Sequence, residues 1–219
     1  MTEGFIFDLD GVVVDTARLH YHAWKRLADE LDIPFTGTDN ERLKGVSRMQ
    51  SLEIVLGLGG RTLGEREKLE LAERKNRWYV ELIGTITPAD LLPGAAEFLE
   101  LVRARGGRTA LGSASRNAPA IVERLGIRRL FDAVVDGSQT SRTKPDPECF
   151  LLCARLLGLA PDRCVVFEDA EAGIEAAHRG GMRAVGIGSP GVLGAAGIVV
   201  PRLSVDDAGL LEFLGLSGR

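Results

Sequence analysis

The stretch Gly4-Phe-Ile-Phe-Asp8-Leu-Asp-Gly11 decides how the rest of the chain is interpreted. It opens with an apolar, aromatic run bounded by polar turn residues, which predicts a short buried strand that ends at Asp8. The carboxylates of Asp8 and Asp10 therefore follow at the carboxyl end of that strand. Both can face one ligand, although acidic turns often do no more than cap or solvate a loop.

Four more apolar runs continue the strand pattern, at residues 109–112, 133–135, 164–167 and 184–187. Helical segments with clear end signals lie between them; in one, Asp146 can cap a helix that has Pro147 in its first turn and Gly158 beyond its end. Strands that alternate with helices predict an α/β fold, a doubly wound parallel sheet with helices on both faces. In such a sheet, chemistry collects at the carboxyl ends of the strands.

The strand pattern is interrupted from about Asp15 to Thr87, where long helical periods replace it. Two apolar helix faces are predicted there, one made by His20, Trp24, Leu27, Ala28 and Leu31 and one by Leu69, Ala72, Asn76, Tyr79 and Ile83. We therefore predict an α/β core domain of residues 1–14 and 88–219, interrupted by an inserted α-helical domain of residues 15–87.

The amino-acid composition limits the binding partners and the cellular compartment that we expect for the protein. The 219 residues include 27 basic and 31 acidic side chains, a net charge of −4 that gives no drive toward nucleic acid or an anionic membrane. The 18 uncharged residues from 184 to 201 contain glycines and prolines, which fits strand, loop and strand better than a membrane span. Three cysteines without a CxxC pair and no signal-like N-terminus indicate a reducing cytoplasm.

Polar residues follow several of the predicted strands. Ser113 ends one strand where a helix opens, which is a ready anion site. Lys144 precedes a helix start, and Glu168 and Asp169 end a further strand. Each has an ordinary interpretation as a turn hydroxyl, a solvated charge or an acidic helix cap. Their joint occurrence at strand ends is much harder to explain in that way.

These strand ends resemble the four motifs of the haloacid dehalogenase superfamily, which here are DLDGVVVDT, SAS, KPDP and EDAEAG. The resemblance implies that Asp8 attacks phosphorus and forms an aspartyl phosphate, and that Asp10 acts as general acid and base. It implies a Mg²⁺ held by Asp8, the Asp10 main-chain carbonyl and Asp169, with Glu168 alongside. Ser113, the N–H of Ala114 and Lys144 would then hold the remaining phosphoryl charge.

The helical insert refines the resemblance, because it would be a cap that closes over the site. Its segments TARLHYHAW, LKGVSRMQS and RKN are similar to those of superfamily phosphomutases that interconvert β-D-glucose 1-phosphate and D-glucose 6-phosphate through β-glucose 1,6-bisphosphate. By that resemblance the non-transferring phosphate is bound by Arg48, Ser115, Arg116 and Asn117. The sugar is lined by Lys44, Gly45 and Val46, with Ser51 nearby. Thr16, His20 and Lys75 would position Asp10 when the cap closes.

Two other functions remain open at this point. A sugar-phosphate phosphatase has the same fold and aspartyl phosphate, with water as the final acceptor, but needs only one phosphate site. A phosphoacceptor signalling module also uses an acidic Mg²⁺ pocket on a doubly wound sheet, but has no use for Asp10 or a cap. We expect a monomer whose partner is a small sugar phosphate.

Overall fold

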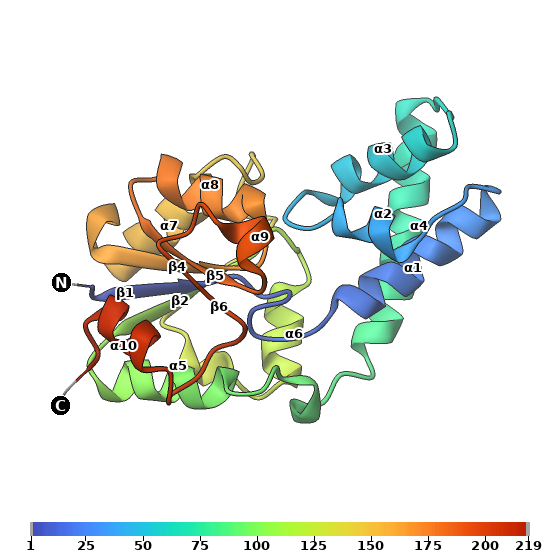
Figure 1. The fold of residues 1–219 in the computed structure, drawn as a ribbon. Helices are drawn as coiled ribbons and strands as arrows, with labels where there is room; N and C mark the ends of the chain where they lie inside the picture. Colours follow the sequence, from blue (N-terminus) through green and yellow to red (C-terminus); the bar gives the residue numbers. More distant parts are fainter. Residues whose placement is uncertain (1, 218–219) are drawn as a thin grey trace. The chain divides into compact units, whose positions relative to one another are not determined.

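A six-stranded sheet organises the first of two units in the computed structural model, which describes residues 2–217 (Figure 1). All five strand pairings are parallel and the order is β3-β2-β1-β4-β5-β6. The strands are β1 (Gly4–Phe7), β2 (Arg108–Gly112), β3 (Ala133–Val135), β4 (Cys164–Glu168), β5 (Arg183–Ile187) and β6 (Ile198–Val200). In this order β1 lies between β2 and β4, where the direction of winding changes and ligands bind in open α/β sheets.

Helices cover both faces of the sheet, and Figure 1 shows α7 and α8 on one face and α5 on the other. The helices of this unit are α5 (Ala95–Ala104), α6 (Ala118–Arg124), α7 (Glu148–Leu157), α8 (Glu171–Arg179), α9 (Pro190–Leu193) and α10 (Ala208–Leu214), with short 3-10 turns at Pro88–Asp90, Arg128–Leu130 and Pro161–Arg163. Because both faces are covered, the central strands β1 and β4 are buried along their whole length.

The register of β1 with its neighbours brings three strand ends level with one another. Phe7 lies opposite Leu111 of β2 and Phe167 of β4, and the Phe7 and Phe167 rings stack with centroids 4.4 Å apart. The residues that follow these positions therefore emerge together at one edge of the sheet. Those residues include Asp8, Gly112 and Glu168.

The second unit is helical. The described chain forms two compact units, one of residues 2–15 and 87–217 and the other of Thr16–Ile86. The helices of the second unit are α1 (Ala17–Glu30), α2 (Gly37–Glu41), α3 (Arg48–Leu58) and α4 (Glu65–Ile83). Side chains from all four helices or their connections pack into one core that includes Trp24, Phe35, Leu52 and Leu71.

The prediction of the apolar face of α4 was wrong at Leu69. That side chain is 55% exposed, whereas Lys75 is only 2% exposed. The buried positions of α4 are Leu71, Ala72, Lys75, Tyr79 and Ile83. The Lys75 ammonium lies 4.6 Å from the ring centroids of both Trp24 and Tyr79, and these aromatic faces accommodate a cation that the periodic pattern places outside the core.

The start of one helix also differs in detail from the prediction. Helix α7 begins at Glu148, so Pro147 occupies the cap position, while the Asp146 Oδ1 atom accepts the Glu148 N–H at 3.0 Å. The segment 184–201 contains strands β5 and β6 as predicted, with the short helix α9 between them. Within residues 2–217, none of the helices has the length and apolar character needed to cross a membrane.

The cysteines lie inside the core. Cys149, Cys153 and Cys164 are buried as free thiols, and all three belong to one apolar cluster of the first unit. Burial raises the pKa of the Cys164 thiol to about 11. These side chains therefore pack as small apolar groups.

Candidate active site

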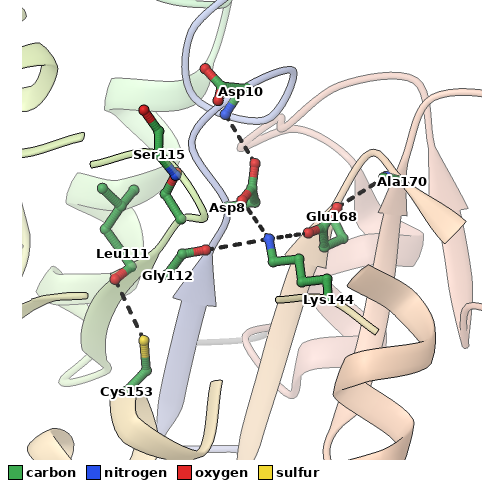
Figure 2. A network of polar contacts seen from close by, with 10 residues as sticks. Asp8, Asp10, Leu111, Gly112, Ser115, Lys144, Cys153, Glu168 and Ala170 are labelled. Carbon is green, nitrogen blue, oxygen red and sulfur yellow. Dashed lines mark hydrogen bonds and ion pairs between the residues drawn. The ribbon is translucent and has the colours of Figure 1, made fainter. Parts of the chain in front are cut away.

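Asp8 is held rigidly at the end of β1. Its N–H donates to the Phe167 carbonyl at 3.0 Å, which continues the hydrogen-bond ladder one residue past the strand. The Asp8 side chain is 10% exposed, and its Oδ2 atom accepts the Asp10 N–H at 3.0 Å (Figure 2). The loop from Asp8 to Asp10 thus presents two carboxylates, a fixed and buried one at Asp8 and a half-buried one at Asp10.

Lys144 joins this carboxylate to a neighbouring strand end. Its ammonium lies 2.5 Å from Asp8 Oδ1 and also pairs with Glu168 Oε1, and it donates to the Gly112 carbonyl at 3.4 Å (Figure 2). The Lys144 and Glu168 side chains are both 1% exposed. One buried cation therefore touches groups at the ends of β1, β2 and β4.

The electrostatics of the buried pair follow from burial and charge together. Burial favours a neutral lysine, but the charges of Asp8 and Glu168 outweigh it and hold the pKa of Lys144 above its usual value. Burial is also the largest influence on Glu168 and, with help from Asp8 and Asp169, raises the pKa of its carboxyl to about 7 against the opposing effect of Lys144. Excess negative charge at this sheet edge is only partly neutralised by one lysine.

Three carboxylates are close enough to share a cation. Oxygen atoms of Asp8, Glu168 and Asp169 lie within 4.8 Å of one another. Carboxylate oxygens are the ligands that Mg²⁺ prefers, and the residual negative charge favours a divalent ion. The donor set therefore fits the magnesium that the motifs imply, and Asp10 lies next to the cluster through its hydrogen bond to Asp8.

Two glycines make room for this cluster. Gly11 has φ +79°, and a Cβ atom there would lie 2.2 Å from Asp169 Oδ2. A Cβ atom at Gly173 would lie 2.0 Å from the Glu168 carboxyl carbon. Any side chain at either position would displace a carboxylate of the site.

The predicted phosphate residues after β2 form a tight turn. Ser113 is 1% exposed, and its Oγ atom accepts the Ser115 N–H at 3.1 Å. The Ser115 Oγ atom in turn accepts the Asn117 N–H at 3.2 Å, just before α6 begins. Ala114 is half-buried and Arg116 is exposed. The turn brings two hydroxyls and the start of a helix to the same sheet edge as Gly112.

His20 and Lys75 contact each other inside the helical unit. Lys75 Nζ lies 3.0 Å from His20 Nδ1, and the His20 ring stacks on Tyr79 with centroids 4.0 Å apart. Burial, followed by the charges of Lys75 and Arg48, holds the pKa of His20 well below its usual range. Sequence reasoning did not single out Trp24 and Tyr79 as partners of Lys75; a lysine four residues before a tyrosine on a buried face was the available signal.

Apart from Thr16, which precedes α1, the remaining predicted residues of the helical unit lie in α3 or in the segment just before it. Arg48 begins that helix, and its guanidinium donates to Glu73 Oε1 of α4 at 2.7 Å. Lys44 pairs with Glu41 at 3.0 Å, and Gly45 has φ +72°, so the segment through Val46 turns sharply before α3. Ser51 and Thr16 are buried, and the Thr16 carbonyl accepts the His20 N–H at 3.0 Å.

Comparison with known proteins bears on this arrangement directly. The model for the haloacid dehalogenase-like hydrolases matches residues 2–181, a range that contains every residue of the acidic site. The chain belongs to this family. Its predicted α/β fold is confirmed, and the family carries metal-dependent phosphoryl transfer, with which the acidic cluster is compatible.

Within the haloacid dehalogenase-like family, two phosphomutases are similar to this chain over nearly its whole length. It is 47% identical over 201 residues to β-phosphoglucomutase of Bacillus subtilis, which covers 91% of this chain and 89% of the relative. A crystal structure of β-phosphoglucomutase from Clostridium difficile has a TM-score of 0.92 at 41% identity, covering 98% of this chain and 97% of that one. The resemblance to phosphomutases of the family is thereby confirmed.

A phosphatase of the same family is more distant. The phosphorylated carbohydrates phosphatase of Thermotoga maritima is 34% identical over 186 residues, which covers 84% of this chain and 83% of the relative. The family thus contains both phosphomutases and phosphatases. The sequence of this member lies nearer to the mutase.

Proposed function

We propose that this protein interconverts β-D-glucose 1-phosphate and D-glucose 6-phosphate, as an isomerase of the β-phosphoglucomutase type. The observation that carries the proposal is the 47% identity over 91% of the chain to a β-phosphoglucomutase, against 34% to a phosphatase. The site supports it, because a fixed buried carboxylate beside a buried ammonium suits nucleophilic attack on a phosphate.

In this proposal Asp8 is the nucleophile. An oxygen of its carboxylate forms a bond to phosphorus while the bond from phosphorus to the sugar oxygen breaks, which leaves an aspartyl phosphate and a free hydroxyl. Asp10, two residues away on the same loop, gives a proton to the leaving oxygen and later takes one from the attacking hydroxyl. The hydrogen bond from the Asp10 N–H to the Asp8 carboxylate fixes the position of Asp8 relative to the Asp10 backbone.

Lys144 and the turn after β2 stabilise charge on the transferring group. Lys144 already lies 2.5 Å from Asp8 and needs little movement to follow the phosphoryl oxygens. Ser113 and the N–H of Ala114 contribute donors from the other side of the sheet edge. A Mg²⁺ held by Asp8, Glu168, Asp169 and the Asp10 main-chain carbonyl would supply further neutralisation of the phosphate charge.

The second phosphate distinguishes a mutase from a phosphatase. We assign it to Arg48 of the helical unit together with Ser115, Arg116 and Asn117 of the core, because a guanidinium fork binds phosphate in one orientation. Lys44, Gly45, Val46 and Ser51 complete the sugar site in the proposal. A bisphosphorylated sugar needs both phosphate sites at once, whereas hydrolysis of a monophosphate needs only one.

The reaction then proceeds through β-glucose 1,6-bisphosphate. Phospho-Asp8 transfers its phosphoryl group to the 6-hydroxyl of β-glucose 1-phosphate, and the bisphosphate returns its 1-phosphoryl group to Asp8. Water competes for the same phosphoryl group, so Asp10 must be activated only when the sugar is bound. We assign that control to Thr16, His20 and Lys75, because the Lys75 ammonium contacts the His20 ring and the Thr16 carbonyl accepts the His20 N–H, which hold His20 in one position. The proposal includes a monomeric protein acting in the cytoplasm.

The product ratio tests this function. The protein is incubated with Mg²⁺, β-glucose 1-phosphate and a trace of glucose 1,6-bisphosphate, and glucose 6-phosphate and inorganic phosphate are followed together. We expect glucose 6-phosphate in large excess over phosphate. Stoichiometric phosphate with little glucose 6-phosphate would instead identify a phosphatase. Labelling of Asp8 by acetyl phosphate without any reaction of sugars would identify a signalling module.

A further inference from the structure

The loop that delivers Lys144 to the site has no regular secondary structure. It covers residues 136–147, between β3 and α7, and several of its side chains are exposed. Lys144 is the buried exception, at 2% exposure. Something other than a strand or a helix must therefore fix the position from which its side chain reaches Asp8.

The carboxylate of Glu148, the first residue of α7, contacts the loop just ahead of Lys144. Its Oε2 atom accepts the N–H of Ser141 at 3.0 Å and the N–H of Arg142 at 2.7 Å. The Ser141 hydroxyl lies 3.1 Å from both carboxylate oxygens. The hydrogen bond from the Arg142 N–H is the main reason that the pKa of Glu148 lies below its usual value, so the group is charged at neutral pH.

The loop is also fixed on the other side of Lys144. Asp146 donates its N–H to the Thr143 carbonyl at 2.9 Å and accepts the Glu148 N–H at 3.0 Å. Its Oδ2 atom lies 3.1 Å from the Arg142 guanidinium. Lys144 thus sits in the middle of a short closed ring of hydrogen bonds, and Glu148 closes that ring.

We propose that Glu148 is a positioning residue for Lys144 and thereby sets how tightly the site binds a phosphoryl group. Glu148 does not itself contact Asp8 or Glu168 among the described interactions; it acts through the loop backbone. The inference rests on the proposed function, because it takes Lys144 to stabilise the transferring phosphoryl group.

The test uses three variants of the full-length protein. The hydrogen bonds that Ser141 and Arg142 donate to the Glu148 carboxylate are called the Glu148 staple. Glu148→Ala removes both acceptor oxygens of the staple, and Glu148→Gln keeps one oxygen while losing the charge and the second oxygen. Glu97→Ala is the matched control, because Glu97, although exposed where Glu148 is half-buried, is also an acidic residue in the first turn of a ten-residue helix of the same unit, α5. The readouts are kcat/KM, the affinity for inorganic phosphate, and amide hydrogen exchange of residues 138–147.

We expect E148A to lose about 10- to 100-fold in kcat/KM, as a displacement of order 1 Å at a catalytic group does. Phosphate affinity should fall with it, exchange at Ser141 and Arg142 should accelerate, and E148Q should recover part of each loss. E97A should match the unmodified protein. A role in folding alone would lower Tm but leave phosphate affinity and kcat/KM of the folded fraction unchanged.

Unchanged kcat/KM and phosphate affinity in both E148A and E148Q would overturn the proposal, and so would an equal loss in E97A. If the unmodified protein did not convert β-glucose 1-phosphate, the proposed function would fail by itself. Phosphate affinity and loop exchange would still decide the role of Glu148 in that case.

Discussion

The Lys144 ammonium lies 2.5 Å from Asp8 Oδ1 in a site where both side chains are almost completely buried. A buried charge is tolerated only when it is paired, and here one lysine contacts two carboxylates, Asp8 and Glu168, and neutralises part of their charge. The same pairing holds the Asp8 carboxylate in place and supplies a cation for the incoming phosphate.

Replacement of Lys144 by alanine should impair activity and folding together. Loss of one partner from a buried ion pair costs about 3–5 kcal/mol, because the remaining charges are left uncompensated. Loss of a charge-stabilising donor should lower kcat by about 10²- to 10³-fold. Urea unfolding and steady-state kinetics measure the two effects. K25A, which removes an exposed pair with Asp29, is the control and should change neither by much.

Removal of Mg²⁺ should abolish activity without unfolding the protein, because Lys144 already neutralises part of the acidic cluster. Addition of Mg²⁺ at about 100 times its Kd should raise the free energy of unfolding by about 2.7 kcal/mol. Thermal melts with EDTA and with Mg²⁺ check this. The increment should be larger in K144A, where the ion replaces a lost positive charge. An unfolded protein in EDTA would contradict the charge balance that we describe.

Gly173→Ala should destabilise the protein although alanine is the better helix former. Glycine to alanine in a helix normally gains up to about 1 kcal/mol. At Gly173 the new Cβ would lie 2.0 Å from the buried Glu168 carboxyl group, which Lys144 and the Ala170 N–H hold in place. Such overpacking costs about 1–3 kcal/mol and should weaken Mg²⁺ binding.

The matched control for that variant is Gly57→Ala in helix α3, where an added Cβ would have no neighbour within 4 Å. G57A should raise the free energy of unfolding, and G173A should lower it. Equal stabilisation by the two substitutions would show that Glu168 can move aside freely.

His20 should make the stability of the protein depend on pH. Its pKa is lowered in the folded state, first by burial and then by Lys75 and Arg48, so below pH 6.5 the unfolded chain binds a proton that the folded chain does not. The contribution of His20 to stability is therefore complete above about pH 6.5 and is lost as the pH drops, by at most about 1.4 kcal/mol per pH unit.

Urea unfolding between pH 7.5 and pH 5 measures the dependence. In H20Q the loss on acidification should be smaller than in the unmodified protein. H178Q, at an exposed histidine, is the control and should follow the unmodified protein. An identical pH dependence in H20Q and the unmodified protein would mean that His20 takes up its proton as readily when folded.

The residues at the strand ends were predictable because their positions follow from local signals. The strands are short and buried on both faces, so their apolar runs stand out, and Asp8 and Glu168 had to emerge near the same edge of a parallel sheet. The direct contacts of Lys144 with Asp8 and Glu168 could not be predicted from the spacing of these residues in the sequence.

Features that depend on packing between distant segments were not predictable. Leu69 fitted the helical period as well as a buried residue would, but the rings of Trp24 and Tyr79 place Lys75 inside instead. The staple at Glu148 depends on the path of a loop backbone, for which the sequence offers no periodic signal. In both cases a charged side chain contacts groups that are distant or belong to the backbone, and a hydropathy pattern does not predict such contacts.

The fate of the phosphoryl group on Asp8 tests the central claim most directly. The protein is phosphorylated with glucose 1,6-bisphosphate labelled in its phosphates, the Asp8 peptide is checked by mass spectrometry, and the phosphoprotein is mixed with β-glucose 1-phosphate or with buffer. We predict a label on Asp8, absent in D8N, that moves to the sugar much faster than it is released in buffer. Release to water at the same rate with and without the sugar would contradict the account.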